Sequence, residues 1–392
     1  MSSLPHRRRR VVATVVAGLS ALIVAGPPAR ASVARGGRPC VRSEIGTVRR
    51  SGSVMLRCVR RAGHDLWTVG PASGTSATAI PSIAIPSTAI PAATRPAAPR
   101  LAAASLPLST APSLSVTNGP QTVRFGGLDR RYVVHRPPGL TPGGPLVVVL
   151  HGGLGGAEQA ESAYGWNDVA DRESFTVVYP EGTDVAIGHA WNAGSCCGPP
   201  AAGGVDDVGF VTAVIDGFVA ARVADPRRIY ATGISNGAML AYRLACEQGG
   251  RFAAIGPVSG TITSTCPTPP PVPVLHIHGL ADGNVPFGGS ASTKGTNIGT
   301  VRTAVPEVMR RFRAAAACPA PTVTTTGPVT RSSAACPGGV DVVLIAIDGA
   351  GHQWPGSTVE PSPAALRLGV DPPSKVLNAT NVLWDFFRAH SL

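Results

Sequence analysis

The chain has 392 residues, of which 44% are hydrophobic and only 5% aromatic, and its formal net charge is +12. Residues 1–70 hold thirteen arginines and two acidic residues, whereas residues 71–392 hold twenty-one basic and twenty acidic residues, so the charge belongs to the N-terminal end. The bulk of the chain thus lacks a basic excess for binding nucleic acid, and its apolar content excludes global disorder.

Residues 1–31 have the parts of an export signal. Arg7 to Arg10 precede an uncharged apolar run at 11–25, and Ala29-Arg30-Ala31 fits a small-residue cleavage site. The apolar run is shorter than the roughly 20 residues needed to span a bilayer. We therefore expect a secreted, extracellular protein whose mature chain starts near Ser32 and has no stable membrane insertion after cleavage.

Residues 32–70 predict a small basic module built as a β-hairpin and closed by a Cys40–Cys58 disulfide. Such a module is too small to fold without its staple. Its arginines suit contact with an anionic wall or surface polymer, although a solvated basic appendage is the simpler alternative. Residues 71–114 are rich in Ala, Pro, Ser and Thr, with a repeated Ala-Ile-Pro, and predict an extended linker.

From residue 115 onward, apolar strands alternate with helical patterns. The expected strands cover 121–125, 131–135, 146–150, 175–179, 229–232, 253–258, 274–277 and 340–347, and the expected helices cover 157–172, 207–222, 236–246, 305–316 and 378–389. The wholly apolar run 146–150 is typical of a buried central strand. The alternation indicates an α/β domain over 115–392, with a mostly parallel sheet and helices on both faces.

Eight cysteines in an exported chain favour disulfides. The pairs that sequence proximity suggests are Cys40–Cys58, Cys246–Cys266 and Cys318–Cys336. The adjacent Cys196 and Cys197 could bridge each other, pair elsewhere or stay reduced. A zinc site is disfavoured because no C-x-x-C or H-x-x-x-H cluster is present, and we expect no metal.

The pentapeptide Gly233-Ile234-Ser235-Asn236-Gly237 has the G-x-S-x-G pattern of a nucleophile elbow. Alone the pattern is weak, since a chain with 47 glycines matches it easily by chance. Here an apolar strand leads into it and a helical stretch leaves it, which puts Ser235 on a sharp turn with an exposed hydroxyl. The helix N-terminus favours developing negative charge. Ser235 is the predicted nucleophile.

The glycine-rich run His151-Gly152-Gly153-Leu154-Gly155-Gly156 directly follows the strand at 146–150. Acyl transfer generates an oxyanion, which needs preorganised backbone N–H donors. We expect these donors to be the amide of Gly153 or Leu154, together with that of Asn236. A plain glycine turn is the alternative, and a phosphate loop is disfavoured because no G-K-[ST] follows.

Two later loops supply an acid and a base. Asp282 follows the strand at 274–277, and His352 lies in a glycine-rich loop after the last strand. His352 would serve as general base to Ser235 and then as general acid to the leaving alcohol, with Asp282 orienting its imidazole. The order Ser235, Asp282, His352 is that of the α/β-hydrolase fold. The rival acids are Asp206, Asp207 and Asp348, and the rival histidines are His151, His276 and His278.

Taken with these motifs, residues 115–392 resemble the secreted polyhydroxybutyrate depolymerase/feruloyl esterase group of α/β-hydrolases. The motifs that carry the resemblance are Leu150-His151-Gly152-Gly153, Trp191-Asn192-Ala193-Gly194-Ser195-Cys196-Cys197-Gly198, Val205-Asp206-Asp207-Val208-Gly209-Phe210, the elbow Gly233 to Gly237, His278-Gly279 with Asp282, and Gly351-His352 with Trp354-Pro355-Gly356. The second and third strings are more specific than the elbow. The resemblance implies hydrolysis of carboxylic esters through an acyl-enzyme, with no metal or organic cofactor.

The resemblance also implies the substrates: aliphatic polyesters, hydroxycinnamoyl esters of polysaccharides, or acetylated xylan. Extracellular polyester depolymerases commonly add a C-terminal substrate-binding domain, which is not seen here, so soluble or polysaccharide-linked esters are favoured. Trp191 and Trp354 are candidates for lining the acyl or sugar pocket, with core packing as the alternative. Asp207 could anchor the Cys196-Cys197 loop or cap the following helix.

Two other functions stay open at this point. A serine peptidase is one, because related folds cleave peptides, although no propeller or large lid domain is evident. The other is a non-catalytic cell-wall or surface-binding protein that acts through residues 32–70.

Overall fold

The structure is a computed structural model that describes residues 48–51, 54–61, 64–69, 114–295, 302–367 and 370–392. The chain divides into two units, Met1–Ala102 and Ala103–Leu392. The expected export signal at 1–31, nearly all of the expected linker at 71–114, and Cys40 lie outside the described residues, so those expectations stay predictions.

The described part of the N-terminal unit is an antiparallel sheet with the order β1-β2-β3. Its strands are β1 (Val48–Ser51), β2 (Val54–Arg61) and β3 (His64–Val69). The register sets Arg50 opposite Met55 and Cys58 opposite Trp67. The unit thus has one strand more than the hairpin predicted for it.

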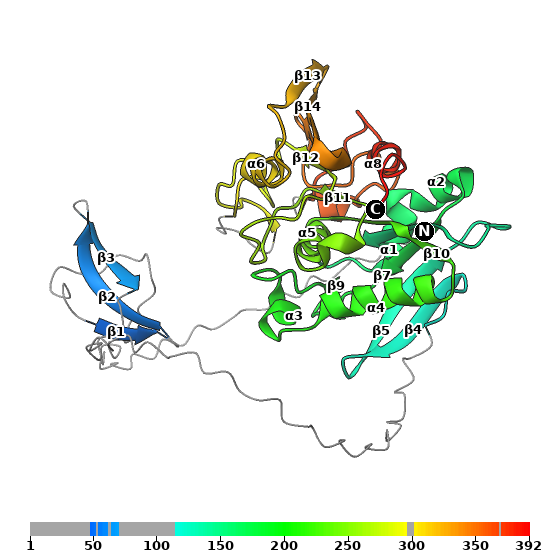
Figure 1. The fold of residues 1–392 in the computed structure, drawn as a ribbon, viewed down its shortest axis with the longest axis horizontal. Helices are drawn as coiled ribbons and strands as arrows, with labels where there is room; N and C mark the ends of the chain where they lie inside the picture. Colours follow the sequence, from blue (N-terminus) through cyan, green and yellow to red (C-terminus); the bar gives the residue numbers. More distant parts are fainter. Residues whose placement is uncertain (1–47, 52–53, 62–63, 70–113, 296–301, 368–369) are drawn as a thin grey trace, which may run out of the picture. The chain divides into compact units, whose positions relative to one another are not determined.

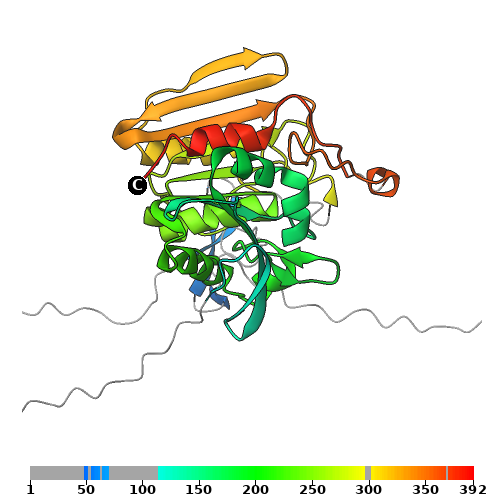
Figure 2. The same cartoon turned by 90° about the vertical axis from the view of Figure 1, so that its right-hand side faces the viewer.

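The larger unit is built on one long sheet, shown in Figures 1 and 2. Its strands are β4 (Gly119–Phe125), β5 (Leu128–His135), β6 (Gly144–Leu150), β7 (Thr176–Pro180), β10 (Ala224–Ile234), β11 (Ala254–Val258), β12 (Val274–Gly279), β13 (Thr322–Thr326), β14 (Val329–Cys336) and β15 (Val340–Ile347). Their order is β13-β14-β15-β12-β11-β10-β6-β7-β5-β4. Every pairing from β15 to β7 is parallel, and the pairings at both edges are antiparallel. The sheet is therefore mostly parallel, as predicted.

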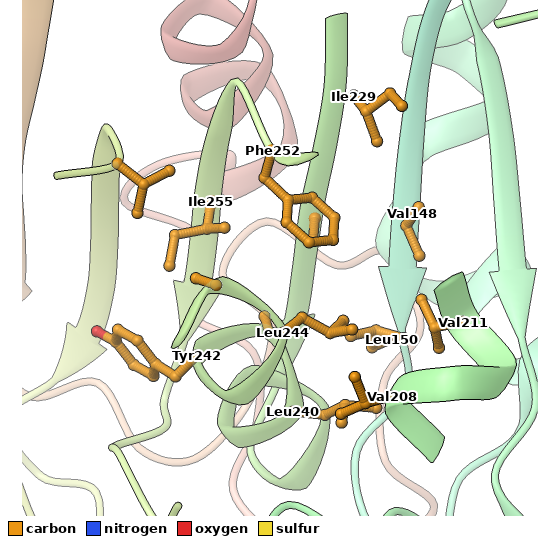
Figure 3. Packing of buried hydrophobic residues seen from close by; sticks show 14 of the residues in the cluster. Val148, Leu150, Val208, Val211, Ile229, Leu240, Tyr242, Leu244, Phe252 and Ile255 are labelled. Carbon is orange, nitrogen blue, oxygen red and sulfur yellow. The ribbon is translucent and has the colours of Figure 1, made fainter. Parts of the chain in front are cut away.

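Helices cover both faces of this sheet, and each face has its own hydrophobic core. The helices are α1 (Ala157–Tyr164), α2 (Trp166–Glu173), α3 (Gly198–Ala202), α4 (Asp207–Ala220), α5 (Asn236–Gln248), α6 (Val305–Ala315), α7 (Pro363–Arg367) and α8 (Ala379–Phe387). Because side chains alternate along a strand, Val148 and Leu150 pack towards α4 and α5 (Figure 3), whereas Val147 and Val149 pack towards α1, α2 and α8.

Two differences from the predicted elements stand out in the larger unit. The single helix expected at 157–172 is two helices, because Gly165 takes a left-handed conformation with φ 71° between them. The antiparallel strands β13 and β14, at the upper end of the sheet in Figure 2, were not expected. The side chains of β13 are all exposed and mostly threonine, so the strand lacks the apolar alternation on which strand prediction depends.

Disulfides join Cys246 to Cys266 and Cys318 to Cys336, which confirms two of the predicted pairs. Cys196 and Cys197 are bridged to each other, one of the three possibilities left open by the sequence. Among the described residues, we find no helix with both the length and the apolar character needed to cross a membrane.

Candidate active site

Ser235 lies on the sharp turn between β10 and α5. Its backbone has φ 56° and ψ −119°, a conformation that costs a non-glycine residue about 1–3 kcal/mol. The turn is tied to the next strand by a hydrogen bond from the Ser235 amide to the Val258 carbonyl, at 3.0 Å. The geometry is that of a strained elbow with its side chain only partly buried.

Two glycines make this elbow possible. A Cβ on Gly233 would overlap the Leu150 carbonyl oxygen, and a Cβ on Gly237 would overlap the carbonyl oxygens of both Leu150 and His151. The elbow therefore packs backbone to backbone against the end of β6. This contact also brings Gly152 beside the nucleophile, since a Cβ there would be 3.7 Å from the Ser235 Cβ.

The glycine-rich loop after β6 presents one of its two expected donors. The Leu154 amide donates to the His189 carbonyl at 2.8 Å, so the proposed role of Leu154 as an oxyanion donor needs correction. Within the described chain, the amides of Gly153 and Asn236 have no hydrogen-bond acceptor. Asn236 is the first residue of α5, where a helix leaves its N–H groups unpaired. Of the three expected donors, Gly153 and Asn236 thus keep a free amide in the described chain.

Asp282 and His352 come together from the loops after β12 and β15. The His352 Nδ1 and Asp282 Oδ2 atoms are 2.6 Å apart, and Asp282 is only 4% exposed. The other carboxylate oxygen, Oδ1, accepts from the amides of Asn284 at 2.9 Å and Val285 at 2.8 Å. Burial raises the pKa of Asp282, but the hydrogen bond and charge of His352 outweigh it and hold that pKa below 3.8. Asp282 therefore stays a carboxylate facing an imidazole.

The three predicted catalytic side chains follow β10, β12 and β15, which run parallel. In the sheet, β15 lies beside β12, and β11 lies between β12 and β10. Their loops therefore emerge at the same edge of the sheet. The Ser235 hydroxyl has no hydrogen-bond partner among the described residues, so only the acid–histidine pair is directly bonded. In free enzymes the serine contact is often loose and tightens when substrate binds.

Asp371 is a site residue that the sequence analysis missed. Its Oδ2 accepts the backbone amide of His352 at 2.8 Å, and its Oδ1 pairs with Lys294 Nζ at 2.5 Å. Gly351 leaves room for this carboxylate, because a Cβ at Gly351 would overlap it. No local motif marks Asp371 or Lys294, since 77 residues separate them.

Trp191 is wholly buried and is held beside the elbow by hydrogen bonds. The side-chain amide of Asn236 holds its backbone, with Oδ1 accepting from Trp191 N at 2.7 Å and Nδ2 donating to Trp191 O at 3.0 Å. The indole Nε1 donates to the His151 carbonyl at 3.0 Å. Trp191 thus connects the elbow to the glycine-rich loop.

Trp354 is also buried, at 1% exposure. Its ring stacks on Tyr164 with centroids 4.5 Å apart, and its Nε1 donates to Thr380 Oγ1 at 3.0 Å. Neither tryptophan reaches the surface, which corrects the expectation that Trp191 and Trp354 line a substrate pocket. Large aromatic side chains fill cores as readily as pockets, and here they fill cores.

Asp206 and Asp207 divide the two roles considered for them. Asp206 caps α4 by accepting from the Gly209 amide at 2.8 Å. Asp207 is fully buried, pairs with Arg130 at 2.6 Å and accepts from the Asn192 amide at 2.7 Å. Asp207 therefore anchors the loop that carries the Cys196-Cys197 disulfide, and helix capping falls to its neighbour.

The remaining rivals of the acid and the base have other places in the fold. Asp348 is exposed after β15. His151 is buried and accepts from the Gly182 amide at 2.9 Å through Nε2, so its Nδ1–H donates to the Gly152 carbonyl at 2.8 Å. Burial lowers the pKa of His151 to about 4, which keeps the ring neutral. His151 thus supports the loop.

A mostly parallel sheet, with helices on both faces and an elbow serine after a central strand, is the architecture of the α/β-hydrolases. The chain has this fold.

Comparison with known proteins identifies the family. The chain belongs to the family described as Esterase PHB depolymerase, whose family model matches residues 130–268. The putative esterase NocK of Nocardia uniformis subsp. tsuyamanensis is 34% identical over 66% of this chain and 80% of its own length. Feruloyl esterase B of Piromyces equi is 28% identical over 57% of this chain and 42% of its length. The protein is therefore a carboxylic ester hydrolase.

Among solved structures, an acetyl xylan esterase from Aspergillus awamori aligns with a TM-score of 0.47 and 15% identity. The alignment covers 64% of this chain and 98% of that one.

Proposed function

We propose that this protein is a secreted serine carboxylesterase with Ser235 as nucleophile, His352 as general base and Asp282 as the orienting acid. The observation that carries the proposal is the 2.6 Å hydrogen bond between His352 Nδ1 and Asp282 Oδ2. This bond fixes the proton on Nδ1 and leaves Nε2 with a lone pair, as a base acting on a serine requires.

The proposed reaction has two halves. In the first, His352 Nε2 takes the proton of Ser235 Oγ as the oxygen attacks the ester carbonyl, and then delivers that proton to the leaving alcohol. In the second, His352 takes a proton from water, the water oxygen attacks the acyl-enzyme, and the proton returns to Ser235 Oγ as the acid leaves. Asp282 remains a carboxylate throughout and stabilises the imidazolium.

The oxyanion formed in each half is assigned to the amides of Gly153 and Asn236. Both are free of other hydrogen bonds in the described chain. Asn236 follows Ser235 in the sequence, and a Cβ on Gly153 would lie 3.7 Å from the Asn236 Cβ. The N-terminus of α5 adds a favourable dipole. Loss of one such donor typically lowers kcat about 100- to 1,000-fold in serine hydrolases.

For the substrate we propose a feruloyl or acetyl ester of a polysaccharide, or a polyhydroxyalkanoate-type ester. The family description and the similarity to a feruloyl esterase support these classes. Export through residues 1–31 fits polymeric substrates, which stay outside the cell. The arginine-rich residues 32–70 would add contact with an anionic polymer, with 71–114 as a spacer before the catalytic domain at 115–392.

The first experiment compares wild type, Ser235→Ala and Ser162→Ala on p-nitrophenyl acetate, followed by methyl ferulate, acetylated xylan and polyhydroxybutyrate. We expect Ser235→Ala to lose at least about a thousandfold in kcat. Ser162 is an exposed serine on α1 that bonds only to the Gln159 carbonyl, so its variant should match wild type. Full activity in Ser235→Ala would refute the proposed nucleophile.

A further inference from the structure

Three buried polar rings form a hydrogen-bonded chain beside Asp282, and the proposed reaction does not use them. Tyr242 Oη lies 2.7 Å from His276 Nδ1, and His276 Nε2 lies 2.9 Å from His278 Nδ1. His278 Nε2 then lies 2.7 Å from the Val285 carbonyl oxygen. All three side chains are 0% exposed. Polar groups buried in this way are costly unless each one is paired.

The placement follows from the strand and the helix. His276 and His278 are two residues apart in β12, so both point to the sheet face that α5 and α6 cover. Tyr242 comes from α5 on that face, and in Figure 3 its hydroxyl points away from the aliphatic side chains labelled beside it. The row of hydrogen-bonded rings thus runs from the core out to the loop that carries Asp282.

The protons in this chain have only one satisfactory arrangement. The Val285 carbonyl can only accept, so His278 carries its proton on Nε2 and has a lone pair on Nδ1. His276 must then donate from Nε2, which leaves its Nδ1 to accept from the Tyr242 hydroxyl. Every donor points towards Asp282, and both imidazoles are neutral.

The electrostatics agree with neutral rings. Burial, partly offset by the charge of Asp282, lowers the pKa of His278 to about 4. Burial together with the neighbouring His278 lowers the pKa of His276 well below 6.5. The titratable groups that face the pair are Tyr242 from α5, Asp282 from the loop after β12 and His352 from the loop after β15.

The row of hydrogen-bonded rings is connected to Asp282 in two ways. Directly, His278 Nε2 lies 3.4 Å from Asp282 Oδ2, the same oxygen that accepts from His352. Indirectly, His278 bonds to the Val285 carbonyl, and the backbone N–H of the same residue donates to Asp282 Oδ1 at 2.8 Å. The imidazole N–H of His278 therefore bonds to the Val285 carbonyl and lies beside Asp282 Oδ2, while the Val285 N–H holds Oδ1.

We infer that His278 is a positioning residue for the proposed reaction, held with its Nε2–H towards Asp282 by His276 and Tyr242. Its role is to keep the Asp282 carboxylate aimed at His352 Nδ1. The inference rests on the proposed function, because it assigns Asp282 and His352 the roles given above. Without the N–H, the carboxylate loses a neighbouring donor and the Val285 carbonyl loses its buried partner.

The test uses the full-length protein and four variants: His278→Leu, His278→Gln, Tyr242→Phe and Tyr230→Phe. Leucine removes the N–H, whereas glutamine can put an amide N–H where His278 has Nε2. Tyr230→Phe is the matched control. It also removes a buried hydroxyl, but that hydroxyl bonds to the His390 carbonyl and takes no part in the row of hydrogen-bonded rings. Turnover is measured on p-nitrophenyl acetate, and reactive serine is counted by titration with a p-nitrophenyl phosphonate.

We expect His278→Leu to lower kcat per titrated serine about 10- to 100-fold, with KM changed less than about threefold, as for other residues that orient a reacting group. His278→Gln should recover most of the loss. Tyr242→Phe should lower kcat about two- to fivefold and Tyr230→Phe should not change it. In ¹⁵N-histidine spectra, His276 and His278 should carry their protons on Nε2 and not titrate between about pH 5 and 9.

The outcomes separate this inference from the proposed function. Equal losses in the leucine and glutamine variants, a loss explained entirely by fewer titrated serines, or an Nδ1–H on His278 would overturn the inference. Wild-type activity in Ser235→Ala, assayed alongside, would instead overturn the proposed function. If Ser235→Ala is inactive and His278→Leu turns over like wild type, only the positioning role is rejected.

Discussion

The nucleophile side and the acid–base side of the candidate site are held in place by different interactions. Around Ser235, the backbone at Gly233 and Gly237 packs directly against the backbone at the end of β6. Around Asp282 and His352, side-chain hydrogen bonds do the holding. The first side should therefore tolerate no added atoms, and the second should tolerate no lost donor or acceptor.

The largest effect should come from removing the negative charge on the acid–base side. In Asp282→Asn the amide no longer selects the Nδ1–H tautomer of His352, and kcat/KM should fall by about 10,000-fold. Asp348→Asn is the matched control, since Asp348 also follows a strand but is exposed. Steady-state kinetics on p-nitrophenyl acetate measures both, and an active Asp282→Asn would show that the acid lies elsewhere.

On the nucleophile side, one added methyl group should be damaging. Alanine in place of helical glycine usually stabilises by about 1 kcal/mol. Gly237→Ala should instead destabilise by about 3 kcal/mol, because the Cβ meets the Leu150 and His151 carbonyl oxygens. Urea unfolding measures the change. Gly250→Ala, whose Cβ meets nothing within 4 Å, is the control, and a stabilised Gly237→Ala would contradict the close packing.

A smaller effect is expected where the acid–base side depends on Asp371. Asp371→Ala removes the acceptor of the His352 amide and should lower kcat about two- to tenfold, which matches one hydrogen bond. Lys294→Met should change kcat less than about twofold, because its ion pair is 40% exposed on the lysine side. Equal losses in the two variants would mean that the ion pair, and not the amide contact, matters.

The smallest effect expected is on stability in acid. The pKa of Asp282 is lower in the folded chain than its ordinary 3.8, so its stabilisation is complete above about pH 4 and is lost as pH falls through the folded pKa. Between pH 5 and 3, wild type should lose more free energy of unfolding than Asp282→Asn does. Asp348→Asn should follow wild type, and parallel curves for all three proteins would argue against a lowered pKa.

The two sides also differ in how far they could be predicted. Ser235, Asp282 and His352 each follow an apolar strand, so topology alone directs them to one edge of the sheet. Asp371 has no such strand before it and reaches His352 only through the tertiary fold. The histidine chain was equally hidden, because period-two spacing places His276 and His278 on one face but says nothing of Tyr242 on a helix.

Other predictions were limited by ambiguous residue types. Trp191 and Trp354 were expected at a pocket, but an indole buries its area just as well in a core, and only the structure distinguishes the two. The sequence could not choose between the amides of Gly153 and Leu154 as oxyanion donor, because only the structure shows that the Leu154 amide bonds to the His189 carbonyl. Gly165 breaks a helix by adopting a left-handed conformation that the helical pattern around it does not reveal.

The two hydrogen bonds between the Asn236 side chain and the Trp191 backbone have a consequence for engineering such enzymes. Asn236 follows the nucleophile in the chain, yet its side chain is committed to a loop 45 residues away, while its backbone N–H is free at the site. The elbow and the tryptophan loop therefore behave as one exchangeable part. A chimaera that takes its loop at 189–197 from a related protein should keep its activity only if residue 236 is taken from that protein as well.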